Sequence, residues 1–463
     1  MEFGYLSLLP VVLVFVMAFV TRKVLVALLA GTIAGVALLS FKEESMAVGI
    51  KCLTDVFSND WSLKSILFCF LIGAFVYVID ASGGVEGLVN FLTEKKRLVT
   101  SGFAAQLLTY GIGLLLFIDG VSSIVVAGVS GRPLFDKLNV SRHKLAYIID
   151  STSSPVAWLF PINAAGAFLM VMVGGQISSN VIKGDSFGYI LSAVPFQLYG
   201  ILSILVVGFG IFSGKEIGDM KTYSSFKSTK NNKPVVFKTD LPFGVRPKSK
   251  NMLLPLLLLV GLNFVILCIS GNGNLFKGDG ATSLVLSGSI TILLTGIFYW
   301  IQRISNFGKY IKWCLHGMSG FLNIVVILAL AFALSNVIKS LETGIYIANL
   351  CREVDVALLP LIVFLVGAII SFATGTSGGT VAILIPITIP LAAGLDANIS
   401  LILGAIISSA VFGDHCSPIS DSTILSSMIA EIPVMEHVKT QIPYALLCGL
   451  LSAIGFLTLG YIM

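Results

Sequence analysis

Long apolar runs recur along this chain, and no other feature limits its fold as strongly. Residues 252–270 and 441–463 are two examples, and similar segments occur throughout. A run of about 18 or more apolar residues can cross a bilayer as a helix. Lipid offers no hydrogen-bond partners to the backbone, so a spanning segment must be a helix or part of a closed barrel. The alternating apolar and polar strands of an outer-membrane barrel are missing from the sequence. We therefore predict an all-α integral membrane protein with about 12 full-length spanning helices.

A polar stretch at residues 213–250 divides the apolar pattern in two. It carries nine Lys or Arg residues against three acidic ones, the clearest charge bias in the chain. Basic loops face the cytoplasm, so we predict that this stretch is cytoplasmic and that both termini lie outside. The predicted domains are a first transmembrane repeat at 1–212, a cytoplasmic basic linker at 213–250 and a second transmembrane repeat at 251–463.

Two short motifs recur in the same order in both halves. Phe117-Ile-Asp-Gly-Val-Ser122 resembles Phe372-Ala-Thr-Gly-Thr-Ser377, which lies 255 residues later. Ser154-Pro155 recurs as Ser417-Pro418, 263 residues later, and the increase of eight residues predicts an insertion in the second half. Because the halves would enter the membrane from opposite sides, we predict two inverted repeats, each with a helical hairpin and a broken transmembrane helix. Paired breaks of this kind are typical of secondary transporters.

Polar residues gather at the four predicted interruptions, which are the two hairpin tips and the two breaks at 150–155 and 413–418. Carboxylates at membrane depth are costly and usually mark an ion or substrate path. Proline removes a backbone hydrogen bond and frees carbonyl oxygens nearby. We predict that ions or substrate are bound by Asp119, Ser122, Asp150, Thr152, Ser154, Thr374, Thr376, Ser377, Asp414, Ser417 and Asp421.

Three of these aspartates, Asp150, Asp414 and Asp421, are the candidate Na⁺ ligands. Burial disfavours the ionised form of a carboxyl group, whereas a bound cation favours it. One carboxylate can therefore hold either H⁺ or Na⁺ but holds both poorly, which allows exchange by alternating access. His415, next to Asp414, is a candidate proton-linked residue, because imidazole titrates near neutral pH.

The segment Phe412-Gly-Asp-His-Cys-Ser-Pro-Ile-Ser-Asp-Ser-Thr423 resembles the signature of the NhaC family of Na⁺/H⁺ antiporters. The resemblance continues through residues 437–446 and includes 372–377 and 142–152. It implies Na⁺/H⁺ exchange and the two-repeat fold of the wider ion transporter superfamily. It also implies a multi-pass protein of the cytoplasmic (inner) cell membrane that forms homodimers, with the lipid bilayer, Na⁺ and H⁺ as its partners.

One departure from the family keeps a second function open. Relatives often carry a second acid and a Tyr-Phe-Asn stretch after Phe-Ile-Asp, whereas this chain continues with Gly120-Val-Ser-Ser123. A roomier, less charged site favours the alternative, a Na⁺- or H⁺-coupled carrier of a small organic anion or amino acid, as in dicarboxylate/monocarboxylate exchange. A remote alternative is an intramembrane serine protease, from Gly128-Val-Ser-Gly131, but Ser130 lacks an obviously paired base. We predict no enzyme activity, no cofactor and no nucleic-acid partner.

Overall fold

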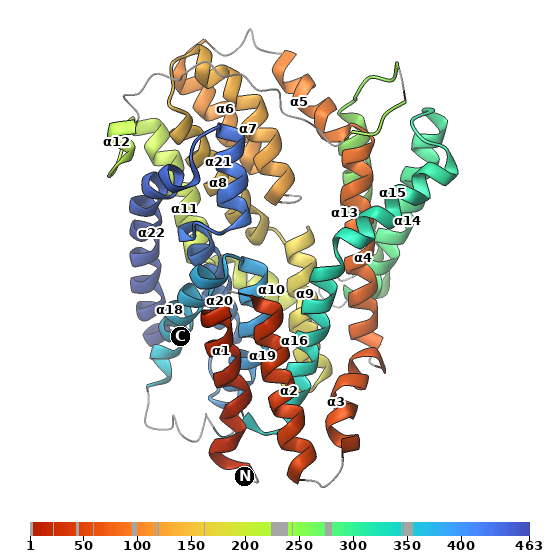
Figure 1. The fold of residues 1–463 in the computed structure, drawn as a ribbon, viewed down its shortest axis with the longest axis vertical. Coiled ribbons are helices and arrows are strands. Elements are labelled where there is room, and N and C mark those ends of the chain that lie inside the picture. The colour runs from red at the N-terminus through yellow and green to blue at the C-terminus, as the bar shows by residue number, and fades with distance from the viewer. Residues whose placement is uncertain are drawn as a thin grey trace.

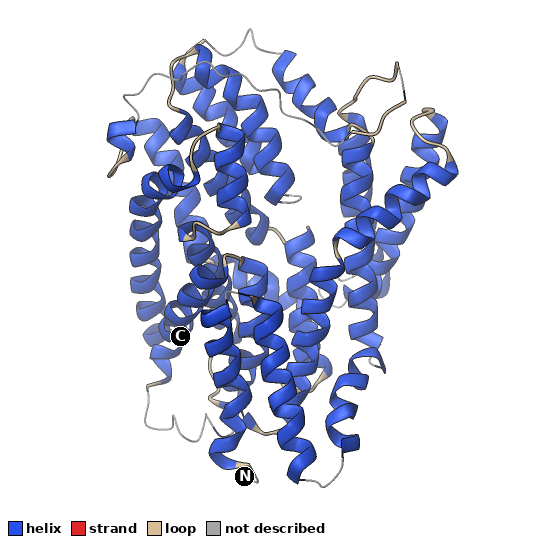
Figure 2. Cartoon of the chain, in the orientation of Figure 1, coloured by secondary structure: helices blue, strands red, loops and turns tan. Residues whose placement is uncertain are grey.

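The computed structural model describes residues 3–463 except 22, 43–45, 59, 95–99, 116, 118–119, 162, 224–238, 243, 274–279, 344–345 and 347–354. All regular structure in this described part is helical (Figure 2). The helices before the linker are α1 (Leu9–Thr21), α2 (Val24–Lys42), α3 (Met46–Ser58), α4 (Asp60–Ala81), α5 (Gly84–Glu94), α6 (Gly102–Leu115), α7 (Gly120–Lys137), α8 (Arg142–Leu159), α9 (Ala164–Ser178), α10 (Ser186–Ala193) and α11 (Leu198–Ser213). Those from the linker onward are α12 (Met220–Tyr223), α13 (Lys250–Ser270), α14 (Gly280–Ile301), α15 (Phe307–Gly320), α16 (Leu322–Ser340), α18 (Leu359–Thr374), α19 (Ser377–Gly394), α20 (Ile399–Cys416), α21 (Asp421–Ala430) and α22 (Val434–Ile462).

Eight helices in the described part are long and apolar enough to cross a membrane, and counting each of two bent pairs as one span gives up to 10. The bend between α8 and α9 is 40°. The bend between Ser186–Phe196, the segment that contains α10, and α11 is 46°. Three further apolar helices are shorter, at Gly4–Ala18, Ile66–Ala81 and Gly102–Leu115. The predicted class, a helical protein with many apolar spans, is confirmed, whereas the predicted number of about 12 spans is not.

The helix starts of the two halves recur at one spacing. Each half contains a helical pair, α6–α7 or α18–α19, followed by a helix, a short break and a second helix. Counterparts begin 257 residues apart: α7 and α19 at Gly120 and Ser377, α8 and α20 at Arg142 and Ile399, and α9 and α21 at Ala164 and Asp421.

The first break lies later than the sequence predicted. α8 continues through Pro155 to Leu159, and the interruption falls at 160–163. Pro155 offers no N–H to the carbonyl oxygen of Ser151, but the hydroxyl group of Ser203 in α11 donates to that oxygen at 3.5 Å. Because a neighbouring helix supplies the missing donor, the helix need not end at the proline. The predicted break at 150–155 is therefore wrong.

The second break overlaps the end of the predicted interruption at 413–418. α20 ends at Cys416 and α21 begins at Asp421. Pro161-Ile162 of the first break recurs as Pro418-Ile419 of the second, again 257 residues later. The predicted insertion of eight residues is therefore wrong, because the helices that follow the tips and those that follow the breaks share one spacing of 257 residues.

The two hairpins lie in opposite halves of the molecule, with α6 and α7 in the upper half of Figure 1 and α18 and α19 in the lower half. α8 packs against α6 and α7, and α20 packs against α18 and α19. Beyond the breaks the helices change partners, since α21 packs against α7 and α8 while α9 packs against α19. Apolar residues of this bundle, such as Ile383 and Ile406, are fully buried.

The described parts of the 213–250 linker lie at the upper end of the molecule in Figure 1, and both termini lie in its lower half. The linker is attached to the bundle by side-chain contacts. Asp240 accepts from Lys309 at 2.8 Å and from the indole N–H of Trp313 at 2.8 Å, and Glu216 pairs with Lys144 of α8.

Candidate ion-binding site

Asp150 lies in the middle of α8, and its side chain is fully buried. Its Oδ2 atom accepts hydrogen bonds from Gln441 Nε2 at 2.8 Å, from His437 Nε2 at 3.2 Å and from the Thr423 hydroxyl group at 3.5 Å. His437 and Gln441 are four residues apart in α22 and therefore share one face of that helix. A buried carboxylate needs such partners. The second half of the chain supplies all of them.

Gln441 and His415 extend this polar cluster toward the second break. Gln441 Nε2 also donates to the backbone carbonyl oxygen of His415 at 2.9 Å. His415 Nδ1 pairs with the hydroxyl group of Tyr199 at 3.1 Å, and the two rings meet edge to face with centroids 5.8 Å apart. Both residues are 1% exposed. These contacts with Tyr199 of α11 therefore hold the His415 imidazole in one orientation.

Asp414 precedes His415 in the last turn of α20 and is 2% exposed. Ser377 and Ser420 lie beside its carboxyl group, and Asp150 lies within electrostatic range. The two buried aspartates thus belong to one polar region, which extends from the middle of α8 to the second break.

Five polar atoms of this region have no hydrogen-bond partner among the residues that the structure describes. They are Asp150 Oδ1, Asp414 Oδ1, Gln441 Oε1, His415 Nε2 and His437 Nδ1. A buried polar group without a partner costs about 1–3 kcal/mol, so most proteins avoid leaving one. Five of them together indicate a functional site rather than a packing fault. Three are oxygen atoms, and two are ring nitrogens that can carry a proton.

Each break holds the hairpin end of its own half. Asn163 Nδ2 donates to the carbonyl oxygen of Phe117 at 2.5 Å and to that of Ala157 at 2.7 Å, while its Oδ1 atom caps α9. In the second half the Ser417 hydroxyl group donates to the carbonyl oxygen of Phe372 at 2.9 Å. Phe117 and Phe372 are the first residues of the two recurring motifs. The same kind of hydrogen bond thus joins hairpin and break in both halves.

The second hairpin tip also contacts the end of α8. Trp158 Nε1 donates to the Ser377 hydroxyl group at 3.1 Å. Gly375, with φ of +64°, precedes Ser377, and a Cβ atom there would lie 2.7 Å from Ile419 of the second break. A side chain at this position would force the tip away from the break.

Several predicted hydroxyl ligands serve the fold in this structure. Thr152 and Thr374 donate back to the carbonyl oxygen four residues earlier, at 2.6 and 2.9 Å. Thr376 caps α19 by accepting from the N–H group of Gly379 at 3.4 Å. Ser154 is 8% exposed and lies beside Gly120 of the first tip. Of the predicted hydroxyls, Ser377 is the one beside Asp414.

The three aspartates predicted to hold Na⁺ differ in position. Asp421 is exposed at the start of α21, where its Oδ1 atom accepts from the N–H group of Ser422 at 2.8 Å. In the described part of the chain, no three His, Cys, Asp or Glu side chains are placed to share one metal ion. Asp119 lies outside the described residues, and so does the side chain of Ser122.

The sequence did not identify His437, Gln441 and Thr423 as partners of Asp150. A signal existed, because His437 and Gln441 are polar residues four apart, the spacing that puts two side chains on one helix face. Their distance in sequence from Asp150, 287 and 291 residues, concealed the contact. Ser130, the basis of the protease alternative, has a buried hydroxyl group that contacts no base among the described residues.

Ion pairs join the helices at the end of α8 that lies away from the break. Arg142, the first residue of α8, pairs with Asp136 at 2.8 Å and with Glu431 at 2.5 Å. Arg132 of α7 also pairs with Glu431, at 3.2 Å. All these side chains are less than one-fifth exposed. These ion pairs join α7, α8 and the C-terminal end of α21 at the start of α8.

Comparisons with known proteins agree with this picture. The model of the Na⁺/H⁺ antiporter family matches residues 166–461. An uncharacterized protein of Haemophilus influenzae is 29% identical and covers 98% of this chain and 91% of its own. The malate-2H⁺/Na⁺-lactate antiporter of Bacillus subtilis is 39% identical over 94 residues, 20% of each chain. The solved structure of the Alcanivorax borkumensis YdaH transporter matches 89% of this chain and 88% of its own, with a TM-score of 0.62 and 13% identity, which shows a shared fold alone. The predicted family is thereby confirmed: this chain belongs to the Na⁺/H⁺ antiporter family.

Proposed function

We propose that this antiporter exchanges Na⁺ for H⁺ at the polar region around Asp150 and Asp414. The observation that carries the proposal is the set of unpartnered oxygens, Asp150 Oδ1, Asp414 Oδ1 and Gln441 Oε1, in a buried setting. Na⁺ is a hard cation, and hard cations take oxygen ligands. A cation among these atoms would neutralise carboxylates that lie far from water. Asp421 would serve as an exposed acid on the approach rather than as a direct ligand.

Protons use the same region when Na⁺ leaves it. A buried carboxylate without a cation favours its neutral form, so H⁺ replaces Na⁺. His437 contacts Asp150 directly, and the free Nδ1 atom of His437 can carry a proton to or from it. His415, with its free Nε2 atom, lies within electrostatic range of Asp150 and can take the same role there. The competition of H⁺ and Na⁺ for one set of oxygens couples their opposite movements.

The two halves, 1–212 and 251–463, would form inverted repeats that open the site alternately to each side. Support comes from the spacing of 257 residues between matching helix starts and from the hairpins in opposite halves of Figure 1. Charge further supports a cytoplasmic 213–250 linker with both termini outside, and the family supports a location in the inner cell membrane. The homodimer stays a prediction from the family.

Purified protein in liposomes with a trapped pH-sensitive dye tests the exchange. We impose a pH gradient, add Na⁺ and compare the native chain with the Asp150→Asn variant. Proton movement on addition of Na⁺, present in the native chain and lost in the variant, is the expected result. Silence with Na⁺ alone, followed by a response when a carboxylate or amino acid is added, would contradict simple cation exchange.

A further inference from the structure

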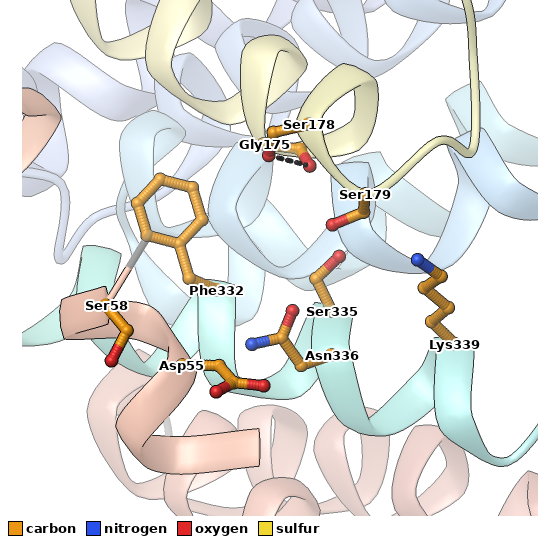
Figure 3. A pocket seen from close by; sticks show the side chains of 9 residues that line it. All are labelled: Asp55, Ser58, Gly175, Ser178, Ser179, Phe332, Ser335, Asn336 and Lys339. Carbon is orange, nitrogen blue, oxygen red and sulfur yellow. Dashed lines mark hydrogen bonds between the residues drawn. The ribbon is translucent and has the colours of Figure 1, made fainter. Parts of the chain in front are cut away.

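A polar pocket lies apart from the region around Asp150, between α3, α9 and α16 (Figure 3). Its volume is about 310 Å³. In Figure 1 these helices extend through the lower half of the molecule, away from the described parts of the basic linker. None of the residues proposed above to bind Na⁺ or H⁺ lines it.

The pocket is formed by one face from each helix. α16 contributes four lining residues at positions i, i+3, i+4 and i+7, which share one helix face. They are Phe332, Ser335, Asn336 and Lys339. The last turn of α9 contributes Gly175 and Ser178, the residue after it contributes Ser179, and α3 contributes Asp55 and Ser58. Seven of the nine lining residues carry a hydroxyl, amide or charged side chain, although apolar faces are expected in spanning helices.

The charged groups of the pocket have opposite signs and stand on different helices. Figure 3 shows the carboxylate of Asp55 on the α3 side and the ammonium group of Lys339 on the α16 side, with Ser335 and Asn336 between them. No ion pair joins Asp55 to Lys339 among the described residues. A small molecule that carries one positively charged and one negatively charged group would match this arrangement.

Buried groups behind the pocket hold its wall in place. Gln176, 1% exposed, donates to the hydroxyl group of Ser335 at 2.9 Å, and its own Oε1 atom has no partner among the described residues. Asn336 Nδ2 donates to the carbonyl oxygen of Cys52 in α3 at 3.1 Å. A Cβ atom on Gly175 would lie 2.8 Å from the ring of Phe332, so α9 and α16 approach closely there. Ser335 and Asn336 are therefore fixed between packed helices, whereas the two charged lining residues, Asp55 and Lys339, are exposed.

We propose that this pocket binds a small zwitterion of the amino-acid class, with its ammonium group toward Asp55 and its carboxylate toward Lys339. The serine hydroxyls and the Asn336 amide offer hydrogen bonds to both ends. The volume of about 310 Å³ suits a small molecule and lies at the low end of ligand pockets. The inference goes beyond Na⁺/H⁺ exchange, because it assigns an organic ligand to a separate place in the fold.

Thermal unfolding of the full-length protein in detergent tests this site. The probes are L-alanine and its two charged halves, propionate and ethylammonium, each titrated separately. A ligand that binds the folded state raises the unfolding midpoint in proportion to its occupancy. We expect L-alanine to raise the midpoint at concentrations at which neither half does.

Variants then place the ligand in the pocket. Asp55→Asn and Lys339→Met should each weaken L-alanine binding about fivefold, since each removes one partly solvated ion pair. Ser179→Leu keeps both charges but fills the pocket, and should abolish binding. Lys183→Met removes an exposed lysine after α9 that does not line the pocket, and should change nothing. The midpoint without ligand reports whether each variant is folded.

Two outcomes would overturn the proposal. The first is L-alanine binding no more tightly than propionate or ethylammonium. The second is folded Ser179→Leu protein that binds L-alanine like the native chain. Na⁺/H⁺ exchange measured on the same samples is expected to persist in the Asp55 and Lys339 variants, so failure at this pocket is separable from failure at the ion site.

Discussion

The two halves of this antiporter share their framework but not their chemistry. Matching helices begin 257 residues apart, and each break donates a side-chain hydrogen bond to the hairpin of its own half. The buried acids do not follow this pattern. α8 ends at Leu159, nine residues after Asp150, whereas α20 ends at Cys416, two residues after Asp414. A recurring framework thus surrounds a site that is not duplicated.

The two acids also differ in their surroundings. Three side chains donate to Asp150 Oδ2, all from α21 and α22. Two serines, Ser377 and Ser420, lie beside the Asp414 carboxyl group, and a serine hydroxyl can either donate or accept a hydrogen bond. Hydrogen bonds to a charged group stabilise a fold more than those to a neutral one. Asp150 should therefore matter for both transport and stability, and Asp414 mainly for transport. The predictions that follow test this difference.

The Asp150→Asn substitution should have the largest effect. It removes a charge that three donors surround, and an amide accepts the same hydrogen bonds less strongly. We expect Na⁺-driven proton movement to fall to the level of empty liposomes. We also expect the free energy of unfolding to fall by about 1–2 kcal/mol. Dye-loaded liposomes measure the first effect, and thermal unfolding in detergent measures the second.

Asp396→Asn is the matched control for this prediction. Asp396 is exposed, lies between α19 and α20 and has φ of +52°, a backbone conformation that asparagine accepts well. The control should transport and unfold like the native chain. Normal exchange in the Asp150→Asn variant would remove this residue from the mechanism.

The Asp414→Asn substitution should abolish exchange equally but leave stability nearly unchanged. Ser377 and Ser420 beside its carboxyl group carry hydroxyl groups, which can donate to an amide oxygen or accept from an amide N–H group. The change in unfolding free energy should stay within about 0.5 kcal/mol. The same two assays serve here. Equal destabilisation of both variants would show that the two acids have the same structural role.

Much of the fold could be predicted from the sequence, because its cause is local. Apolar runs of spanning length, the hairpin around Thr376 and the break after Cys416 each depend on residues close together in the chain. Proline was a poorer guide. Pro155 stays within α8 because Ser203, 48 residues away from it, donates to the exposed carbonyl oxygen of Ser151. No local pattern carries that information.

The site could be predicted only in part, for the same reason. Asp150, Asp414 and His415 were predicted as candidates because ionisable residues are rare in apolar segments, and the structure buries all three. Thr152 and Thr374 were predicted as ligands, yet they donate back within their own helices. His437 and Gln441 were not predicted, because only the packing of α22 against α8 brings them to Asp150.

The Gln441→Leu substitution should have an intermediate effect. Gln441 donates to both Asp150 and the carbonyl oxygen of His415, and its free Oε1 atom is one of three proposed Na⁺ ligands. Leucine keeps most of the volume and removes the oxygen. We expect the Na⁺ concentration for half-maximal exchange to rise about tenfold, equivalent to about 1.4 kcal/mol of binding. The maximal rate should change less.

Gln106→Leu is the control for the Gln441 prediction. Gln106 is a half-buried residue of α6 that donates to the carbonyl oxygen of Gly102 in its own helix. Its loss should leave the Na⁺ dependence unchanged. Unaltered Na⁺ dependence in Gln441→Leu as well would show that the amide oxygen is not a ligand.

The smallest effects on transport should come from substitutions at the two breaks, and they test the comparison of the halves most directly. Asn163 donates to two carbonyl oxygens and caps α9, whereas Ser417 donates to one. Asn163→Ala should therefore lower the unfolding free energy by about 1–2 kcal/mol, and Ser417→Ala by about 0.5–1 kcal/mol. If the hydrogen bonds also fix the hairpin ends, both variants should exchange Na⁺ a few-fold more slowly with unchanged Na⁺ affinity. Slower exchange in only one variant would mean that just one of the two hairpin ends needs this hydrogen bond for transport, although both helix frameworks keep the same spacing.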